Sequence, residues 1–201
     1  MFKRVIINCL LLSQQGTRSL TSLFTKKPII LLDVDGVINS ARLGEIKWRD
    51  EKQESIGGYN IVYSPEVITR INKWSEIADI KWLTAWNEEA RSVLAPRLKL
   101  NDFEVARKTE IGKEDAAIQN AAAHGPDGLV IWIDDDLKWF HSNSKGNKEH
   151  SIGIFDRPNT VLLSPRRGLT YEHCNFIDEV LSNPEKSKDK VLCEFEEGDR
   201  L

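Results

Sequence analysis

Two short stretches of this sequence are apolar without interruption, and acidic residues follow each of them directly. Residues 28–32 run into Asp33, and residues 129–133 run into three consecutive aspartates. A strand with apolar side chains on both faces is typical of a parallel sheet that helices cover on both sides. Segments with helical spacing of apolar residues separate these and three further strand-like runs. The sequence therefore predicts an α/β fold of three layers, with a parallel sheet between two layers of helices.

The predicted elements fill residues 27–182, which we expect to form one folded domain. We expect strands at residues 28–33, 80–84, 103–106, 129–133 and 160–163, and helices at 64–77, 87–95, 113–123 and 171–181. Pro96 is expected to end the second helix, because the residue before a proline disfavours helical backbone. At about residues 40–63, two short alternating runs flank Gly57 and Gly58, which predicts a small β-hairpin flap. This interval is too short for a large cap domain.

Composition excludes several classes of protein. The 40% hydrophobic and 29% charged residues are ordinary for a folded globular chain. Three widely spaced cysteines exclude a disulfide framework and a cysteine-based zinc site. No apolar run approaches the roughly 18 residues that span a bilayer. The net charge of −3 does not indicate a general nucleic-acid surface, although it leaves local basic loops possible. The oligomeric state is left open.

The first 26 residues differ in charge from the rest of the chain. No acidic residue precedes Asp33, whereas five basic residues do, and the stretch is rich in Ser and Thr. A basic, hydroxyl-rich and acid-free N-terminus is typical of a mitochondrial transit peptide. A short apolar run at residues 5–12 leaves a secretory signal open, and a disordered extension of a cytoplasmic protein is the other alternative. Residues 183–201 are expected to form a charged tail.

Acidic side chains stand where two of the predicted strands end. Asp33 and Asp35 follow the first strand, and Asp134 and Asp135 follow the fourth. Parallel strands have their carboxyl ends at one edge of the sheet, so these carboxylates are expected close together. Like charges 4 Å apart repel by roughly 4 kcal/mol at an intermediate dielectric. A divalent cation relieves this repulsion, and carboxylate oxygens suit Mg²⁺, so we expect a Mg²⁺ site.

A hydroxyl and an ammonium group are expected at the same edge. Thr84 ends the second strand, and Lys113 begins the helix before the fourth strand. Such groups can hold charged phosphoryl oxygens, while one carboxylate attacks phosphorus and a second transfers protons. The set indicates phosphoryl chemistry. Lys108 lies nearby and is the alternative to Lys113.

The order of these parts resembles the haloacid dehalogenase (HAD) superfamily of hydrolases over about residues 28–182. The matching motifs are Asp33-Val34-Asp35-Gly36-Val37, Leu83-Thr84, Lys113 and Ile133-Asp134-Asp135. In this superfamily the parallel sheet is Rossmann-like and has the strand order 5-4-1-2-3. The resemblance implies the same order here, with Asp33 beside Asp134.

The resemblance also implies a role for each matching residue. It implies that Asp33 is the nucleophile, which forms an aspartyl-phosphate, and that Asp35 is the general acid and base. The implied phosphoryl-binding residues are Thr84, Ala85 and Lys113. The implied Mg²⁺ ligands are Asp33, Asp134, Asp135 and the backbone carbonyl of Asp35.

A narrower resemblance is to an uncharacterised, capless branch of the superfamily, which includes phosphatase-like domains attached to RNA-repair proteins. The segments that resemble this branch are Tyr63-Ser64-Pro65-Glu66, Trp82-Leu83-Thr84-Ala85-Trp86-Asn87, Leu94-Ala95-Pro96 and Ser164-Pro165-Arg166-Arg167-Gly168-Leu169-Thr170. They are specific for the branch and say little about the substrate.

Four further side chains are candidate substrate contacts. Trp48 in the hairpin region and Trp86 after Thr84 could overhang the site and stack on bases or sugars, or they could pack in the core. Arg166 and Arg167 follow the fifth strand and could hold a second phosphate, or they could lie in a solvated loop.

The sequence thus predicts a Mg²⁺-dependent phosphatase that works through an aspartyl-phosphate. Without a large cap, an open site would accept bulky substrates such as phosphorylated nucleic-acid ends. The alternatives are another HAD-type hydrolase or phosphotransferase and a catalytically silent binding module.

Overall fold

The central sheet is parallel and has the predicted strand order. The computed structural model describes residues 26–40, 48–106, 112–144, 153–165, 167–184 and 192–193. The strands of the sheet are β1 (Ile29–Leu32), β4 (Asp79–Trp82), β5 (Glu104–Val105), β6 (Val130–Ile133), β7 (Thr160–Leu163) and β8 (Leu192–Cys193), in the order β5-β4-β1-β6-β7-β8. The five predicted strands are confirmed. The short edge strand β8 is an addition from within the expected charged tail.

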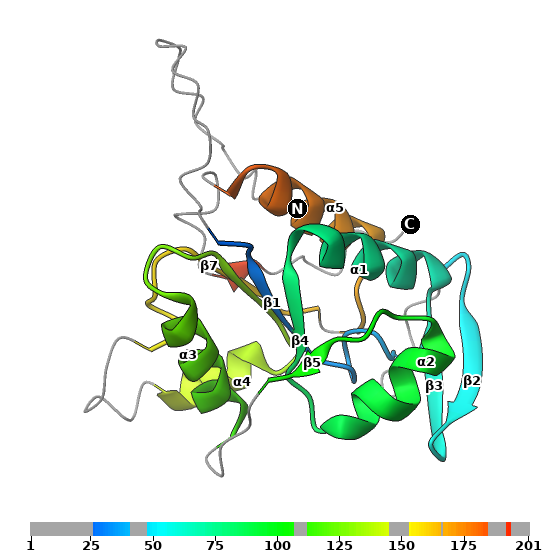
Figure 1. Cartoon of the computed structure of the whole chain (residues 1–201). Coiled ribbons are helices and arrows are strands. Elements are labelled where there is room, and N and C mark those ends of the chain that lie inside the picture. Colours follow the sequence, from blue (N-terminus) through cyan, green and yellow to red (C-terminus); the bar gives the residue numbers. More distant parts are fainter. Residues whose placement is uncertain are drawn as a thin grey trace, which may run out of the picture.

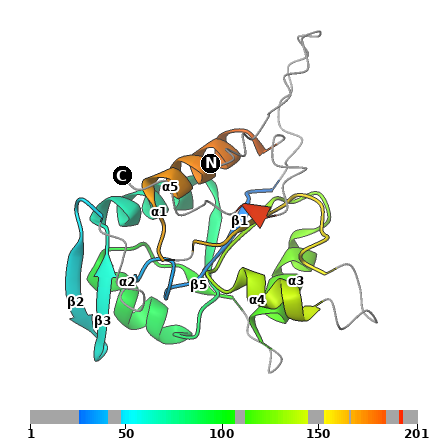
Figure 2. The ribbon, with the colours of Figure 1, turned by 180° about the vertical axis from the view of Figure 1, so that it is seen from behind.

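Helices cover both faces of this sheet, which confirms the three layers. Helices α1 (Pro65–Ile77) and α5 (Tyr171–Ser182) lie side by side on one face, and α3 (Lys113–His124) and α4 (Leu137–Ser144) lie on the other (Figure 1, Figure 2). Alternate residues of β1 serve the two layers. Ile30 and Leu32 belong to the apolar cluster that includes α1, whereas Leu31 belongs to the cluster that includes α3. Packing on both faces thus holds the strands in register, so that the ends of β1, β4 and β6 lie at the same level.

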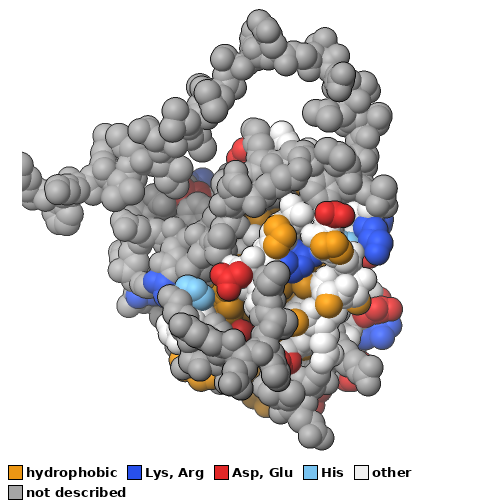
Figure 3. Space-filling model, turned by 90° about the vertical axis from the view of Figure 1, so that its left-hand side faces the viewer, with side chains coloured by type: hydrophobic (Ala, Val, Ile, Leu, Met, Phe, Trp, Pro, Cys, Tyr) orange, Lys and Arg blue, Asp and Glu red, His pale blue; other side chains and the backbone are white. Residues whose placement is uncertain are grey.

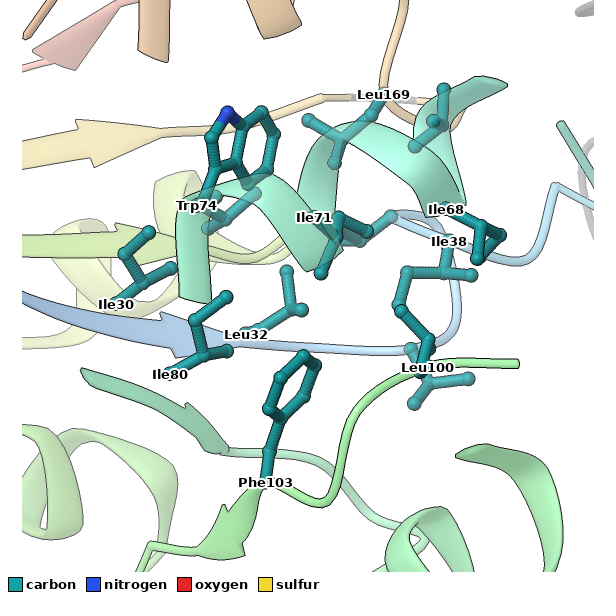
Figure 4. Packing of buried hydrophobic residues seen from close by; sticks show 14 of the residues in the cluster. Ile30, Leu32, Ile38, Ile68, Ile71, Trp74, Ile80, Leu100, Phe103 and Leu169 are labelled. Carbon is teal, nitrogen blue, oxygen red and sulfur yellow. The ribbon is translucent and has the colours of Figure 1, made fainter. Parts of the chain in front are cut away.

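The first helix begins and packs as the sequence predicts. The Ser64 hydroxyl accepts a hydrogen bond from the Val67 N–H at 3.2 Å, and Pro65 occupies the first turn. Ile68, Ile71 and Trp74 of α1 belong to the buried apolar cluster (Figure 4), and Trp74 Nε1 donates to Asp178 Oδ1 of α5 at 2.6 Å. These contacts attach α1, which directly follows the inserted hairpin, to the buried core.

The predicted hairpin is confirmed between β1 and α1. It consists of β2 (Lys52–Ile56) and β3 (Tyr59–Tyr63), and the two lie beside α2 (Ala95–Leu98) in Figure 1 and Figure 2. Gly57 and Gly58 have φ of 60° and 84°, which is the double positive φ of a two-residue type I′ turn. Among the described residues, this hairpin is the only regular secondary structure that the insertion between β1 and α1 forms.

The prediction that Pro96 ends the second helix is wrong. A π-helical turn η1 (Ala90–Leu94) precedes it, in which the Ala95 N–H bonds to the Ala90 carbonyl. Pro96 then falls in the first turn of α2, where its missing N–H has no helical partner to lose. The helix ends instead at Lys99, whose φ is 60°.

The surface seen in Figure 3 mixes charges among its described side chains. Acidic, basic and hydrophobic side chains alternate over this face, and the described ones form no broad field of a single sign. Within the described residues, no helix is both long enough and apolar enough to cross a membrane. Apart from Lys26, the expected targeting segment lies outside the described residues.

Candidate active site

The carboxylates of Asp33 and Asp134 lie side by side because their strands end at the same level. In the sheet Leu32 pairs with Ile133, and the Asp33 N–H continues the ladder to the Ile133 carbonyl at 3.1 Å. One oxygen from each of Asp33, Asp134 and Asp135 lies within 4.8 Å of the others. We call this group the carboxylate cluster. It is mostly buried, with Asp33 4% and Asp134 0% exposed.

Lys113 bridges two members of the cluster. Its Nζ lies 2.6 Å from Asp33 Oδ2 and 2.9 Å from Asp134 Oδ2. Lys113 is the first residue of α3, as expected, and the alternative residue Lys108 lies outside the described residues. The structure therefore brings the predicted lysine to the predicted carboxylates.

Burial sets the protonation of the cluster. Burial, together with the neighbouring Asp33, raises the pKa of Asp134 to about 6. Burial and the charges of Asp134, Asp136 and Asp33 raise the pKa of Asp135 to about 7. Burial also raises the pKa of Asp33, against the opposing effect of Lys113. Burial is thus the main reason why these carboxylates hold protons more tightly, and repulsion between carboxylates adds to it at Asp134 and Asp135.

The cluster fits a hard divalent cation. Three ionised carboxylates and one ammonium leave a formal charge of −2 in a largely buried space. Carboxylate oxygens are the ligands that Mg²⁺ accepts most readily. Asp33, Asp134 and Asp135 could therefore hold such an ion, and its charge would offset the cost of burying three carboxylates and the repulsion between them.

Gly36 makes room for Asp135. The φ of Gly36 is 73°, and a Cβ atom at this position would lie 2.1 Å from Asp135 Oδ2. The glycine thus serves both the sharp turn after β1 and the close approach of a cluster member. The sequence indicates the turn, whereas the approach joins segments almost a hundred residues apart.

Asp35 lies outside the carboxylate cluster and is held by two neutral donors. Asn39 Nδ2 donates to Asp35 Oδ1 at 2.9 Å, and Trp86 Nε1 donates to Asp35 Oδ2 at 3.0 Å. Sequence reasoning missed Asn39 as a site residue. Its spacing of four from Asp35, after a turn-forming glycine, is the signal that could have found it.

Thr84 and Ala85 follow the strand next to β1. The Leu83 N–H bonds to the Leu32 carbonyl at 2.9 Å, which carries Thr84 to the level of Asp33. Thr84 is fully buried, and its side chain forms a hydrogen bond with Asp33. Ala85 is exposed, so its backbone can be reached by a substrate.

The four candidate substrate contacts have different positions. Trp48 is 6% exposed, and its Nε1 donates to the Leu169 carbonyl at 2.8 Å, which agrees with the packing alternative. Trp86 is also buried but contacts Asp35. Arg167 is half-buried in the loop after β7, and Arg166 lies outside the described residues. Substrate contacts by the two arginines stay predictions.

One comparison with known proteins gave a match. Residues 29–174 match the model of the family described as "HAD domain in Swiss Army Knife RNA repair proteins", which covers well over half of the chain and the whole carboxylate cluster. A HAD domain supports hydrolase activity of the phosphatase type. Neither the curated proteins nor the solved structures contain a match to this chain. On the strength of the family match and of the strand order, the chain belongs to the family of HAD domains found in Swiss Army Knife RNA repair proteins.

Proposed function

We propose that this protein is a Mg²⁺-dependent phosphomonoesterase that acts through an aspartyl-phosphate on Asp33. The observation that carries the proposal is the buried carboxylate cluster with Lys113 bridging Asp33 and Asp134. A nucleophilic carboxylate needs a phosphoryl group beside it and cations that neutralise the phosphoryl oxygens. The Lys113 ammonium and a divalent ion at the cluster are suited to that task.

The metal site consists of side chains that the fold already brings together. Asp33, Asp134 and Asp135 would hold Mg²⁺, with the carbonyl of Asp35 as the fourth protein ligand that the family resemblance implies. When bound, Mg²⁺ supplies positive charge for the phosphoryl oxygens and orients the group for attack.

In the first step, a carboxylate oxygen of Asp33 attacks phosphorus and the ester P–O bond breaks. The leaving oxygen takes the proton of the Asp35 carboxylic acid, so the alcohol departs neutral. The family resemblance assigns Thr84 and Ala85 to the phosphoryl oxygens during this transfer; Ala85 is exposed, and Thr84 lies beside Asp33. Asp35 is left as a carboxylate, and the phosphoryl group is on Asp33.

In the second step, water attacks the phosphorus of the aspartyl-phosphate. Asp35 accepts a proton from this water, and the bond between phosphorus and Asp33 breaks. Inorganic phosphate leaves, and both aspartates return to their starting protonation. Lys113 stays beside the Asp33 carboxylate and stabilises it as it re-forms.

Nucleic-acid ends are the substrates that we favour. The described insertion after β1 is a two-stranded hairpin, which leaves more access than a large cap domain would. The matching family is named for domains of RNA repair proteins. A phosphorylated end of a polynucleotide strand is a bulky phosphomonoester that such a site would admit.

Turnover of p-nitrophenyl phosphate by the full chain tests the activity. We expect Mg²⁺-dependent hydrolysis that Asp33→Asn abolishes, while the exposed control Asp156→Asn retains it. A phosphorylated Asp33 trapped in the Asp35→Asn variant and seen by mass spectrometry would identify the intermediate. Equal turnover in the wild type and in both active-site variants would reject the proposal, and turnover no higher than the background in all of them would favour a silent binding module.

Transfer to an acceptor other than water is the second enzymatic candidate. The same aspartyl-phosphate could pass its phosphoryl group to an alcohol in place of water. Hydrolysis in the presence of glycerol distinguishes the two, because a phosphotransferase would form glycerol phosphate in excess over inorganic phosphate.

We also propose mitochondrial targeting by residues 1–26, on the basis of their basic, acid-free composition. Fusion of these residues to a fluorescent protein in eukaryotic cells tests this, and a cytoplasmic or secreted signal would reject it.

A further inference from the structure

Both donors that hold Asp35 are themselves held by the hairpin. On one side, Asn39 donates to Asp35 Oδ1, and the side-chain oxygen of Asn39 accepts from the Val62 N–H in β3 at 3.0 Å. Asn39 itself is buried, with 4% of its surface exposed, and the two residues that it joins are half-buried. The Ser40 N–H also bonds to the Val62 carbonyl at 2.9 Å. The turn after β1 is therefore attached to β3.

On the other side, the indole of Trp86 spans the distance from Asp35 to the hairpin turn. Its Nε1 donates to Asp35 Oδ2, while its ring lies against Tyr59, with centroids 4.9 Å apart and planes at 56°. At the turn itself, a Cβ atom on Gly57 would lie 3.8 Å from Cζ3 of the same indole. Trp86 is 8% exposed, so most of its indole is covered, with the exposed ring of Tyr59 on its outer side.

A carboxyl group held at both oxygens has little freedom to rotate. A carboxylate oxygen can take part in two hydrogen bonds. Each oxygen of Asp35 already accepts one, so it can form one more, in a fixed direction. Proton transfer needs that partner within about 3 Å and in line. A displacement of about 1 Å in a catalytic group costs on the order of 10²-fold in rate.

We propose that Asn39 and Trp86 are positioning residues for Asp35 and that the β2–β3 hairpin braces both of them. The inference rests on the proposed function of Asp35 and adds a function for the hairpin beyond that of a flap. The hairpin supplies the fixed frame from which Asp35 gives its proton to the leaving oxygen. Tyr59, which is 58% exposed, is the outermost member of this brace.

The dependence of the rate on the leaving group tests the proposal. An alkoxide needs a proton as the ester bond breaks, whereas p-nitrophenolate leaves without one. Trp86→Phe removes the N–H and keeps an aromatic ring. We expect it to lower kcat/KM for an alkyl phosphomonoester at least 10-fold more than for p-nitrophenyl phosphate. The KM for p-nitrophenyl phosphate is expected to change little.

The hairpin part of the brace has its own variants. Tyr59→Ala removes an exposed ring and leaves the core intact, and we expect the same selective loss with a smaller size. Tyr59→Phe restores the ring and should restore the ratio of the two substrates. Equal losses for both substrates in Trp86→Phe and Tyr59→Ala, or no loss in either, would overturn the proposal, because packing alone treats the two leaving groups alike.

A measurement without turnover separates this inference from the proposed function. In ¹H–¹⁵N spectra, the Trp86 indole signal is the one that Trp86→Phe removes. We expect Asp35→Ala to move this signal, and the exposed control Asp156→Ala to leave it in place. An unmoved signal means that the hydrogen bond is absent, and the proposal is then wrong even if the protein is a phosphatase. A moved signal in a protein without turnover would reject the phosphatase function and keep the contact.

Discussion

At Gly36 the chain comes closer to Asp135 than any side chain would allow. A Cβ atom there would lie 2.1 Å from Asp135 Oδ2, and the φ of 73° is unfavourable for other residues. Gly36→Ala should therefore displace Asp135 and lower both Mg²⁺ affinity and turnover. Gly58→Ala is the matched control, because its φ of 84° carries a similar strain of about 1–2 kcal/mol but its Cβ would meet open space.

Comparing Gly36→Ala with Gly58→Ala separates the effect of the clash with Asp135 from the effect of backbone strain. Both variants should lose stability in thermal unfolding from backbone strain, Gly36→Ala should lose more because of the clash, and Gly36→Ala alone should need more Mg²⁺ for half-maximal turnover. A Gly36→Ala variant with the Mg²⁺ dependence of Gly58→Ala would show that Asp135 does not need this space.

The raised pKa values of Asp134 and Asp135 make the metal-free protein sensitive to pH. A carboxyl whose pKa is higher in the folded state binds its proton more tightly there, so folding is favoured at low pH and loses stability as pH rises. With pKa values of about 6 and 7, the loss falls between about pH 4 and pH 7. A divalent ion at the cluster should offset it, because ligand binding to the folded state stabilises that state.

Thermal unfolding with EDTA and with Mg²⁺ tests this at pH 5 and pH 8. We expect Mg²⁺ to raise Tm more at pH 8 than at pH 5, since protons compete for the carboxylates. In EDTA, Asp135→Asn should lose less Tm between the two pH values than the wild type, because it lacks one of the titrating groups. An equal effect of Mg²⁺ at both pH values would contradict the expectation.

At the scale of elements, Asp50 joins the hairpin entrance to two helices. Its carboxylate accepts from the Ser64 hydroxyl at 2.7 Å, the Glu66 N–H at 2.7 Å and the Tyr171 hydroxyl at 2.9 Å. Burial alone would raise the pKa of Asp50, but these hydrogen bonds outweigh it and lower the pKa below its usual value. The carboxylate thus stabilises the first turn of α1 and fixes the start of α5 against it.

Asp50→Ala should destabilise the fold by about 1–2 kcal/mol in urea unfolding at pH 7, the usual cost of a lost helix cap with its hydrogen bonds. A lowered pKa means that the stabilisation is present above about pH 4 and is lost as pH falls further. The difference from the wild type should therefore shrink toward pH 3. Glu51→Ala, which removes a neighbouring exposed carboxylate, is the control and should leave stability within about 0.5 kcal/mol.

Elements with a strong local signal could be predicted from the sequence. The buried strands are short apolar runs, and α1 has its cap and its apolar face in one continuous segment. The sequence analysis does not predict helix α4, and just before this helix begins Asp134 Oδ1 accepts from the Asp136 N–H at 3.0 Å. The prediction that Pro96 ends the second helix is wrong because the π-helical turn before it contains no proline or glycine that would indicate it.

At the scale of the whole molecule, strand order explains what the sequence could predict of the site. Asp33, Thr84 and Asp134 could be predicted as neighbours because each follows a strand whose end a parallel sheet must align. The support of Asp35 could not, because Trp86 reaches it over 51 positions and the hairpin reaches it through Asn39. Such contacts depend on packing between separate segments and leave no mark in local spacing.

The small size of the described cover, a two-stranded hairpin, leads to a prediction about substrate size. The chain has a net charge of −3, and the described side chains on the face seen in Figure 3 mix both signs, so a long electrostatic track for a polynucleotide is not expected on that face. We expect kcat/KM for a single-stranded oligonucleotide with a terminal phosphate to exceed that for the matching mononucleotide. Its logarithm should fall with the logarithm of salt concentration at a slope of about −2 or shallower, as for three or fewer phosphate contacts on a single strand.

Steady-state kinetics at several salt concentrations measure both quantities. A clear preference for the mononucleotide would point to a small metabolite as the substrate and would contradict the assignment of nucleic-acid ends. A slope steeper than about −4 would require about six or more phosphate contacts, and so a basic track longer than any on the face seen in Figure 3. A shallow slope with a preference for the longer strand would mean that recognition is concentrated at the phosphorylated end, beside the carboxylate cluster and the hairpin that braces Asp35.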